Sequence, residues 1–220
     1  MPASVGHKER ATAARCSTPI DQSRYDTKKD FPGKREIYDS PFSGIVEAAL
    51  VAEGVAPADL YPLDVTRGLK KLDTIKSSLV ISPTFAAMQN DMQSNPAAMP
   101  LLVTTTTNVV NLTTPLTPVW DFTSWDTATF GIRHNAPHEA EAQKFLAFIT
   151  EPSTQIGYAP KGGLGVAPNN IDPSTIPYTA IQAANNPFQS NRGTVLQQSN
   201  DFWDAQYASI LTTWTKWKVS

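Results

Sequence analysis

The chain has 220 residues and a mass of 23.9 kDa, with 40% apolar residues, enough to bury about 70% of the surface that the unfolded chain exposes. Lysine and arginine number 18 against 20 acids, so the net charge of −2 lacks the basic excess of a nucleic-acid-binding protein. Apolar runs are short, as at 45–52, and predict no membrane-spanning helix. The length suits one large domain or two small lobes.

The start of the chain differs from the rest in charge and pattern. Residues 1–35 hold eight of the 18 basic residues and four acids. No apolar periodicity occurs over 1–24, which we expect to be poorly ordered. The single cysteine, Cys16, excludes an internal disulfide and a cysteine-based zinc cluster. Charged residues stand where a secretion signal needs an apolar run, so no export signal is expected in the chain as written.

The first predicted elements are a strand and two helices. A Pro-Gly turn leads into a short strand at 36–38. Ser43 can cap a helix over 44–53, and Gly54 marks its end. Asp64 is the natural N-cap of a second helix. Apolar residues recur in that helix at helical spacing: Val65, Leu69, Leu72 and Ile75.

The middle of the chain predicts two further strands around a helix. Val80 and Ile81 begin a strand, a short helix follows over 85–93, and a buried strand is expected over 99–103. The inward side chains of the helix are expected to be Phe85, Met88 and Met92. Ten of the 24 threonines then fall between 104 and 129, which favours strand and loop because threonine is β-branched.

The last part predicts two more helices. A strand is expected over 129–132 and a helix over 138–150 with an apolar face that includes Phe145 and Phe148. The proline-rich stretch 151–200 predicts turns. Asn200 is then the expected cap of a long amphipathic helix. Its apolar stripe is Trp203, Tyr207, Ile210, Trp214 and Trp217.

Catalytic and metal-binding alternatives depend on two histidines. The sequence has no Gly-x-Ser-x-Gly elbow that would present a nucleophile. His134 and His138 with nearby acids suggest a metal group, but Pro137 breaks the helical face that two-histidine ligation uses. We therefore expect no metal, no cofactor and no catalysis. A hydrolase or metal-dependent enzyme that uses His134 and His138 is kept as the alternative.

A different cluster suits the binding of an organic cation. Trp120, Asp121, Trp125 and Asp126 place two indoles beside two carboxylates in a proline- and threonine-rich segment. An aromatic face with a carboxylate beside it holds a cation by cation–π attraction and charge pairing. The alternative is that the tryptophans lie in a core and the aspartates at turns.

Several stretches, taken in order, resemble the family 1 extracellular solute-binding proteins of ABC importers, especially the spermidine/putrescine-binding branch. The resemblance covers about residues 25–220. Its motifs are Phe-Pro-Gly-Lys-Arg at 31–35, the stretches 48–55 and 59–64 with the Lys-Lys-Leu helix at 70–72, the helix at 144–149 with the Gly-Tyr turn at 156–160, and the tail motifs at 201–203 and 214–217.

The resemblance implies an α/β fold of the type II periplasmic-binding-protein class, two-lobed, with the N-terminal half of the first lobe missing. It implies a middle lobe over 25–125 and a return to the first lobe with a C-terminal helix over 126–220, after an atypical segment at 1–24. The implied protein is a periplasmic or extracellular monomer that captures a polyamine-like cation and delivers it to a membrane permease. A third hypothesis is a truncated chain that has the fold but no complete cleft.

The resemblance also implies where the solute would lie. Trp125 would stack on the solute, Asp126 would pair with its charge, and 106–108 would hydrogen-bond to it, in place of a Trp-Asn-Gly-Arg-like segment of relatives. The full set of candidate ligand-binding residues is Trp125, Asp126, Thr106, Thr107, Asn108, Trp120 and Asp121.

Overall fold

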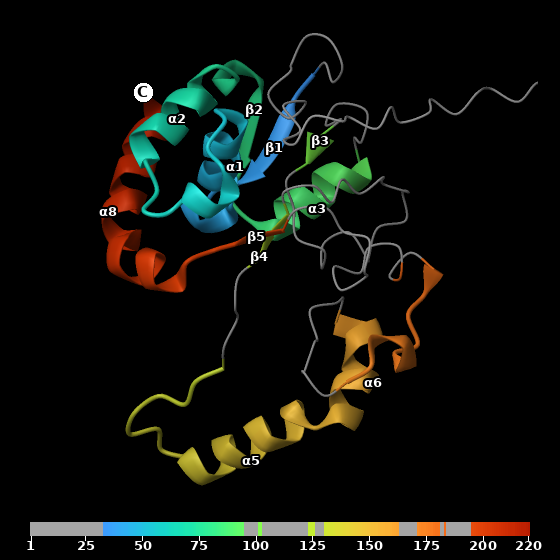
Figure 1. The fold of residues 1–220 in the computed structure, drawn as a ribbon. Helices are drawn as coiled ribbons and strands as arrows, with labels where there is room; N and C mark the ends of the chain where they lie inside the picture. The colour runs from blue at the N-terminus through green and yellow to red at the C-terminus, as the bar shows by residue number, and fades with distance from the viewer. Residues whose placement is uncertain are drawn as a thin grey trace, which may run out of the picture.

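The computed structural model of the chain describes residues 33–94, 101–102, 123–125, 130–162, 171–180, 183 and 195–220. Figure 1 shows a body in which a small parallel sheet is flanked by α1, α2 and α8 and by α3. The helices α5 (Glu139–Thr150) and α6 (Pro152–Gly162) pack on each other and are drawn away from this body (Figure 1). The candidate site therefore has to be sought first around the sheet.

The sheet has three parallel strands in the order β2-β1-β3. They are β1 (Arg35–Tyr38), β2 (Leu79–Ser82) and β3 (Leu101–Leu102). The strands predicted at 36–38 and 80–81 are thus confirmed, and of the strand predicted at 99–103 the structure describes two residues. Since β2 and β3 lie on opposite sides of β1, the direction of winding reverses at the carboxyl end of β1.

The helix α1 (Ile45–Ala52) is central, and all of its residues are buried. Its N-cap is Gly44 and not Ser43, because the chain first makes a 3-10 turn, Pro41–Ser43, in which Ser43 Oγ donates to the carbonyl oxygen of Ser40 at 2.7 Å. Gly44 has φ of 78°, and a Cβ atom there would lie 2.4 Å from Ser124 Oγ. Glycine is required at this position by both its backbone angle and its close neighbour.

The helix α2 (Val65–Asp73) begins as the sequence predicts. Asp64 Oδ1 accepts a hydrogen bond from the backbone N–H of Arg67 at 3.0 Å, which is an N-cap interaction. Leu69 and Leu72 are buried against α1. Short 3-10 turns at Pro57–Asp59 and Lys76–Ser78 flank this region.

The long helix α8 (Asn200–Val219) completes the same core. Its N-cap is Ser199, whose Oγ accepts from the N–H of Phe202 at 3.3 Å, so the predicted cap at Asn200 is off by one residue. Four members of the predicted stripe are buried: Trp203, Ile210, Trp214 and Trp217. Tyr207 is 41% exposed, so this member of the stripe is not buried. A lobe boundary at 125/126 stays a prediction, and any such boundary must leave α8 with α1 and α2.

The remaining elements differ in part from the expectations. The helix α3 (Phe85–Ser94) buries Met88, whereas Phe85 is 40% exposed and not inward. Residues 130–132 form no strand, since no neighbouring strand among the described residues pairs with their backbone.

The two outlying helices also differ from the prediction. The helix α6 occupies part of the segment expected to be turns, with Pro152 at its first position, where proline fits a helix. In α5, Phe145 and Phe148 are 58% and 55% exposed. Beyond them, a 3-10 turn forms at Pro173–Thr175. Within the described ranges, no helix combines the length and apolarity needed to cross a membrane.

Candidate functional site

The carboxyl edge of the β2-β1-β3 sheet is the first candidate for a binding site. In open parallel sheets, ligands bind outside the carboxyl ends of the strands, where the strand order reverses. That point here is the end of β1, at Tyr38, followed by Asp39 and Ser40. The side chains around Tyr38 therefore decide what this edge can hold.

An aromatic pair forms this edge. The rings of Tyr38 and Phe85 are stacked, with centroids 4.1 Å apart and planes at 15°. Phe85 is the first residue of α3, and Thr84 before it accepts through Oγ1 from the N–H of Ala87 at 3.1 Å, which fixes the start of the helix. Since Phe85 is 40% exposed, the pair presents an aromatic surface to solvent at the edge of the sheet.

The carboxylate beside this pair is already occupied. Asp39 Oδ1 accepts from Trp214 Nε1 at 2.8 Å, and Lys218 Nζ lies 2.7 and 2.5 Å from its two oxygens. Burial acts to raise the pKa of Asp39, but the hydrogen bonds from Lys218 and Trp214 and the charge of Lys218 outweigh it and lower this pKa. Asp39 therefore anchors α8 and has its charge neutralised within the chain.

A buried carboxylate in α1, Glu47, is the centre of a hydrogen-bond network. Glu47 Oε1 accepts from Tyr61 Oη at 2.7 Å, from Trp203 Nε1 at 3.0 Å and from Gln198 Nε2 at 3.2 Å. Gln198 Nε2 also donates to the carbonyl oxygen of Phe42 at 3.0 Å. Burial and the charge of Glu47 raise the pKa of Tyr61, so its hydroxyl stays a donor.

The strand that carries Trp125 runs close to the same edge. This strand, β4 (Thr123–Trp125), pairs in parallel with β5 (Val195–Gln197), directly before Gln198. Ser124 lies against Gly44, in the turn that follows β1. The strand of Trp125 thus adjoins the turn after β1, and the side chain of Trp125 lies outside the described residues. The other candidates also lie outside them: Thr106, Thr107, Asn108, Trp120, Asp121 and Asp126.

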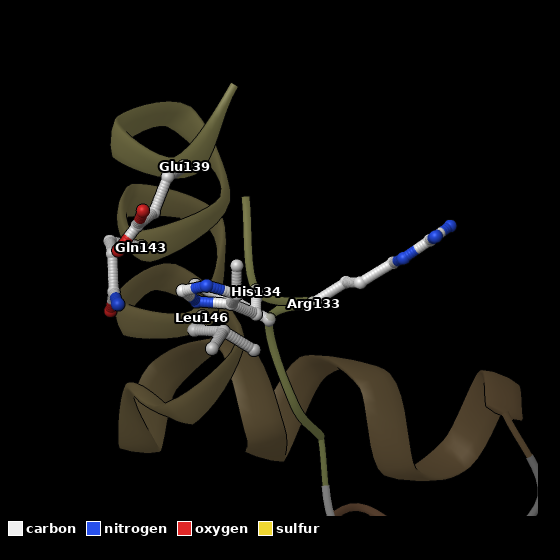
Figure 2. A pocket seen from close by; sticks show the side chains of 6 residues that line it. Arg133, His134, Glu139, Gln143 and Leu146 are labelled. Carbon is white, nitrogen blue, oxygen red and sulfur yellow. The ribbon is translucent and has the colours of Figure 1, made fainter. Parts of the chain in front are cut away.

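The histidines of the enzyme alternative lie on α5 and the segment before it. Figure 2 shows a pocket of about 340 Å³ with the ring of His134 against α5, near Leu146, while Arg133 extends away. The pocket is lined by Ile132, Arg133, His134, Glu139, Gln143 and Leu146. His138 is exposed at the N-cap of α5. No group of three His, Cys, Asp or Glu side chains that could hold a metal forms among the described residues.

The Tyr38–Phe85 surface was not among the residues that the sequence indicates for binding. Tyr38 is recognisable as a strand end, followed by Asp-Ser-Pro, which is a turn signal. That β1 is the central strand, with the winding reversing at its end, depends on pairing with β2 and β3 more than 40 residues away. The site-forming role of this edge follows only from the sheet order.

Comparison with known proteins identifies the class of the chain. Residues 9–185 match the family described as bacterial extracellular solute-binding protein, and the chain belongs to that family. The family is one of extracellular solute-binding proteins, as the motifs of the sequence predict.

Individual relatives are longer than this chain. A gamma-aminobutyric acid (GABA)-binding protein of Pseudomonas aeruginosa is 28% identical over 200 residues, which are 81% of this chain and 55% of that protein. The solved Atu4243-GABA receptor is 29% identical, with a TM-score of 0.75 over 88% of this chain and 59% of its own. An ABC transporter substrate-binding protein from Bradyrhizobium japonicum is 25% identical, with a TM-score of 0.66 over 91% and 63%. The chain thus spans little more than half the length of these relatives.

The solved structures confirm the α/β periplasmic-binding-protein fold. The family is confirmed, but these relatives are named for GABA or for no particular solute, and none is named for spermidine or putrescine. The identity of the solute therefore remains a matter for proposal.

Proposed function

We propose that the chain is the solute-capturing part of an ABC importer and that its solute is a small molecule with an ammonium group, delivered to a membrane permease. The observation that carries the proposal is the Tyr38–Phe85 pair, an exposed aromatic surface at the carboxyl edge of the sheet. An ammonium group over an aromatic face gains about 0.5–2 kcal/mol, depending on how far it is desolvated. No bond is made or broken in the solute.

The charge that would pair with the ammonium group is proposed to come from Asp126. Asp39 is closest to the aromatic pair in sequence, but Lys218 neutralises it. Asp126 directly follows β4, which lies against Gly44 beside this edge. Trp125 would add an indole, and 106–108 and the segment at 120–121 would complete the contacts. Binding would proceed by closure of two lobes, because a solute stabilises the state in which it touches both.

Two solute chemistries fit an ammonium site. A polyamine has ammonium groups only, which suits the Trp-Asp cluster of the sequence. GABA, for which two relatives are named, has an ammonium group and a carboxylate, and needs a cationic or N–H partner as well. We propose that the solute is a polyamine-like cation, and the test compares its binding with that of GABA.

Calorimetry on the whole chain tests the proposal. We expect one-to-one binding of putrescine or spermidine, weaker binding of GABA, and none of uncharged butyramide. Tighter binding of GABA than of the polyamines would identify an amino acid as the solute and keep the ammonium site. Binding of butyramide as tight as that of the polyamines would contradict the ammonium site. Phe85→Ala should weaken binding at least about tenfold, a loss of about 1.4 kcal/mol. Tyr207→Ala is the matched control, because Tyr207 is 41% exposed against 40% for Phe85 but lies on α8.

A second candidate is a chain that has the fold but cannot bind solute alone. It is favoured by the chain spanning 55% and 59% of two relatives, and by large exposed apolar side chains on α5 and α6, namely Phe145, Phe148 and Tyr158. On this view the cleft needs residues that only the longer relatives have. None of the four compounds would then bind, and a hydrophobic dye would bind strongly.

A further inference from the structure

A buried carboxyl group lies beneath α3. Glu36 is on the central strand β1 and has 0% of its surface exposed. Its Oε1 accepts a hydrogen bond from Ser82 Oγ on the neighbouring strand β2. Its Oε2 is also buried and has no hydrogen-bond donor among the described atoms. A buried oxygen of this kind is costly unless it carries a proton or meets a cation.

Few charged groups occur on the described elements that pack around Glu36. Asp91 is the one ionisable residue of α3, and β2 and β3 have none. On β1 itself, Arg35 projects to the opposite face by strand alternation, and its Nη1 donates to the carbonyl oxygen of Gly33 at 2.7 Å. The group that faces Glu36 from α3 is thus another acid.

The effect on Glu36 agrees with this geometry. Burial raises the pKa of Glu36, the hydrogen bond from Ser82 opposes that rise in part, and the charge and hydrogen bond of Asp91 add to it. Two neighbouring carboxyl groups in a buried site cannot both ionise without a penalty. The protonated carboxyl of Glu36 can instead donate its O–H to a carboxylate oxygen of Asp91.

This carboxyl pair lies where α3 is attached to the sheet. Phe85, at the start of α3, stacks on Tyr38, and Met88, one turn further, is fully buried. Asp91 follows one turn later and faces Glu36, two residues before Tyr38 on the same face of β1. The position of α3 therefore determines the aromatic surface at the edge of the sheet.

We infer that α3 is held on the sheet by one proton shared between Glu36 and Asp91, and that α3 and its aromatic surface loosen when this proton is lost to solvent. Below the ordinary Glu36 pKa of 4.5 the attachment is at full strength. Because the attached state binds the proton more tightly than the loosened state, attachment weakens as the pH rises from 4.5 through the raised pKa. A carboxylate in an ion pair has the opposite pH dependence, because its contribution to stability is lost as the pH falls.

Hydrogen exchange of the whole chain, without any solute, tests the inference. The exchange of α3 is compared with that of α1 between pH 4.5 and pH 8, after correction for the intrinsic rate. We expect the corrected exchange rate of α3, divided by that of α1, to increase with pH. The increase should be up to about tenfold per pH unit over the range in which the Glu36 carboxyl loses its proton. In Glu36→Gln this ratio should stay flat, because no buried carboxyl group titrates there. In Asp91→Asn the slope should move to lower pH, because the charge of Asp91 no longer adds to the burial that raises the pKa of Glu36. Asn90→Asp, an added acid on the exposed side of α3, should keep the wild-type slope.

Two outcomes overturn the inference: a wild-type α3 whose opening relative to α1 does not change with pH, and a pH slope that is the same as in the wild type in Glu36→Gln or in Asp91→Asn. If Glu36→Gln fails to fold, Asp91→Asn decides, since Asp91 is only half-buried. No solute is present, so failure here leaves the proposed solute binding untouched. Conversely, a chain that binds no solute can still show this pH slope.

Discussion

Lys218, in the last turn of α8, forms an ion pair at 2.5 Å with Asp39, the residue that follows the central strand β1. The two residues are 179 positions apart in sequence, and both side chains are about one quarter exposed. Trp214 Nε1 donates to the same carboxylate at 2.8 Å. The end of α8 is thereby fixed to the turn beside the proposed binding edge.

The first prediction concerns this ion pair. Lys218→Met keeps the apolar stem and should lower the free energy of unfolding by about 1 kcal/mol at neutral pH, as expected of a partly exposed pair with two hydrogen bonds. Lys216→Met, in the same turn but exposed, is the control and should change the free energy of unfolding by less than about 0.5 kcal/mol. Urea unfolding measures both. Equal effects of the two substitutions would contradict the role of the pair.

The same pair predicts a pH dependence. The pKa of folded Asp39 is below its ordinary value of 3.8, so its contribution is present above pH 3.8 and is lost as the pH falls through the lowered pKa. The difference in stability between wild type and Lys218→Met should therefore shrink in acid. Urea unfolding at pH 7 and at successive values below 3.8 measures it, and a constant difference would falsify the assignment.

The second prediction concerns the buried Glu47. Glu47→Ala removes the acceptor that Tyr61, Gln198 and Trp203 share and should destabilise the fold by about 3 kcal/mol or more. Glu53→Ala, at the end of the same helix, removes only surface ion pairs to Arg67 and Lys71 and should cost less than about 1 kcal/mol. Thermal unfolding compares the two. A loss for Glu47→Ala no larger than that of the control argues against the network.

The third prediction separates a steric contact from backbone strain. Gly44 and Gly54 both have positive φ, 78° and 90°, so alanine strains the backbone at either position by about 1 kcal/mol. Only at Gly44 would the new Cβ atom meet another group, Ser124 Oγ at 2.4 Å, whereas nothing lies within 4 Å at Gly54. Gly44→Ala should therefore cost about 1–3 kcal/mol more in urea unfolding. Ser124→Gly should recover part of that excess, and no recovery means that β4 does not lie against Gly44.

The fourth prediction concerns the exposed aromatic residues of α5. Phe145 and Phe148 lie three residues apart and are more than half exposed. Phe145→Ser with Phe148→Ser should reduce the fluorescence of a bound hydrophobic dye at least about twofold and leave the unfolding midpoint nearly unchanged, since exposed side chains contribute little to folding. Tyr207→Ser on α8 is the control and should not reduce the dye signal. A large fall in the midpoint would show that these rings are covered.

Local signals in the sequence predict the elements that depend on neighbouring residues. Asp64 caps α2 because its side chain reaches an N–H three positions ahead. The stripe of Trp203, Ile210, Trp214 and Trp217 is buried because helical spacing alone places these side chains on one face. The family resemblance, based on motifs in order along the chain, is confirmed for the same reason.

Features that depend on distant residues are not predicted. Gly44, and not Ser43, caps α1 because a 3-10 turn comes first, and the approach of Ser124, 80 positions later, excludes a side chain there. Phe85 is exposed because it stacks on Tyr38 at the edge of the sheet, which no periodicity reveals. Of the proposed ligand-binding residues, only Trp125 lies on a described strand, so the Trp-Asp cluster stays a prediction.

The packing of α8 has a consequence for how the chain comes to be folded. Trp203, Trp214 and Trp217 complete a core whose other half is supplied by residues 37–75, and their polar contacts span 144 to 175 positions. Such distant contacts form late, and here they cannot form before residues 200–219 have been synthesised. The first two thirds of the chain must therefore leave the ribosome with an open core.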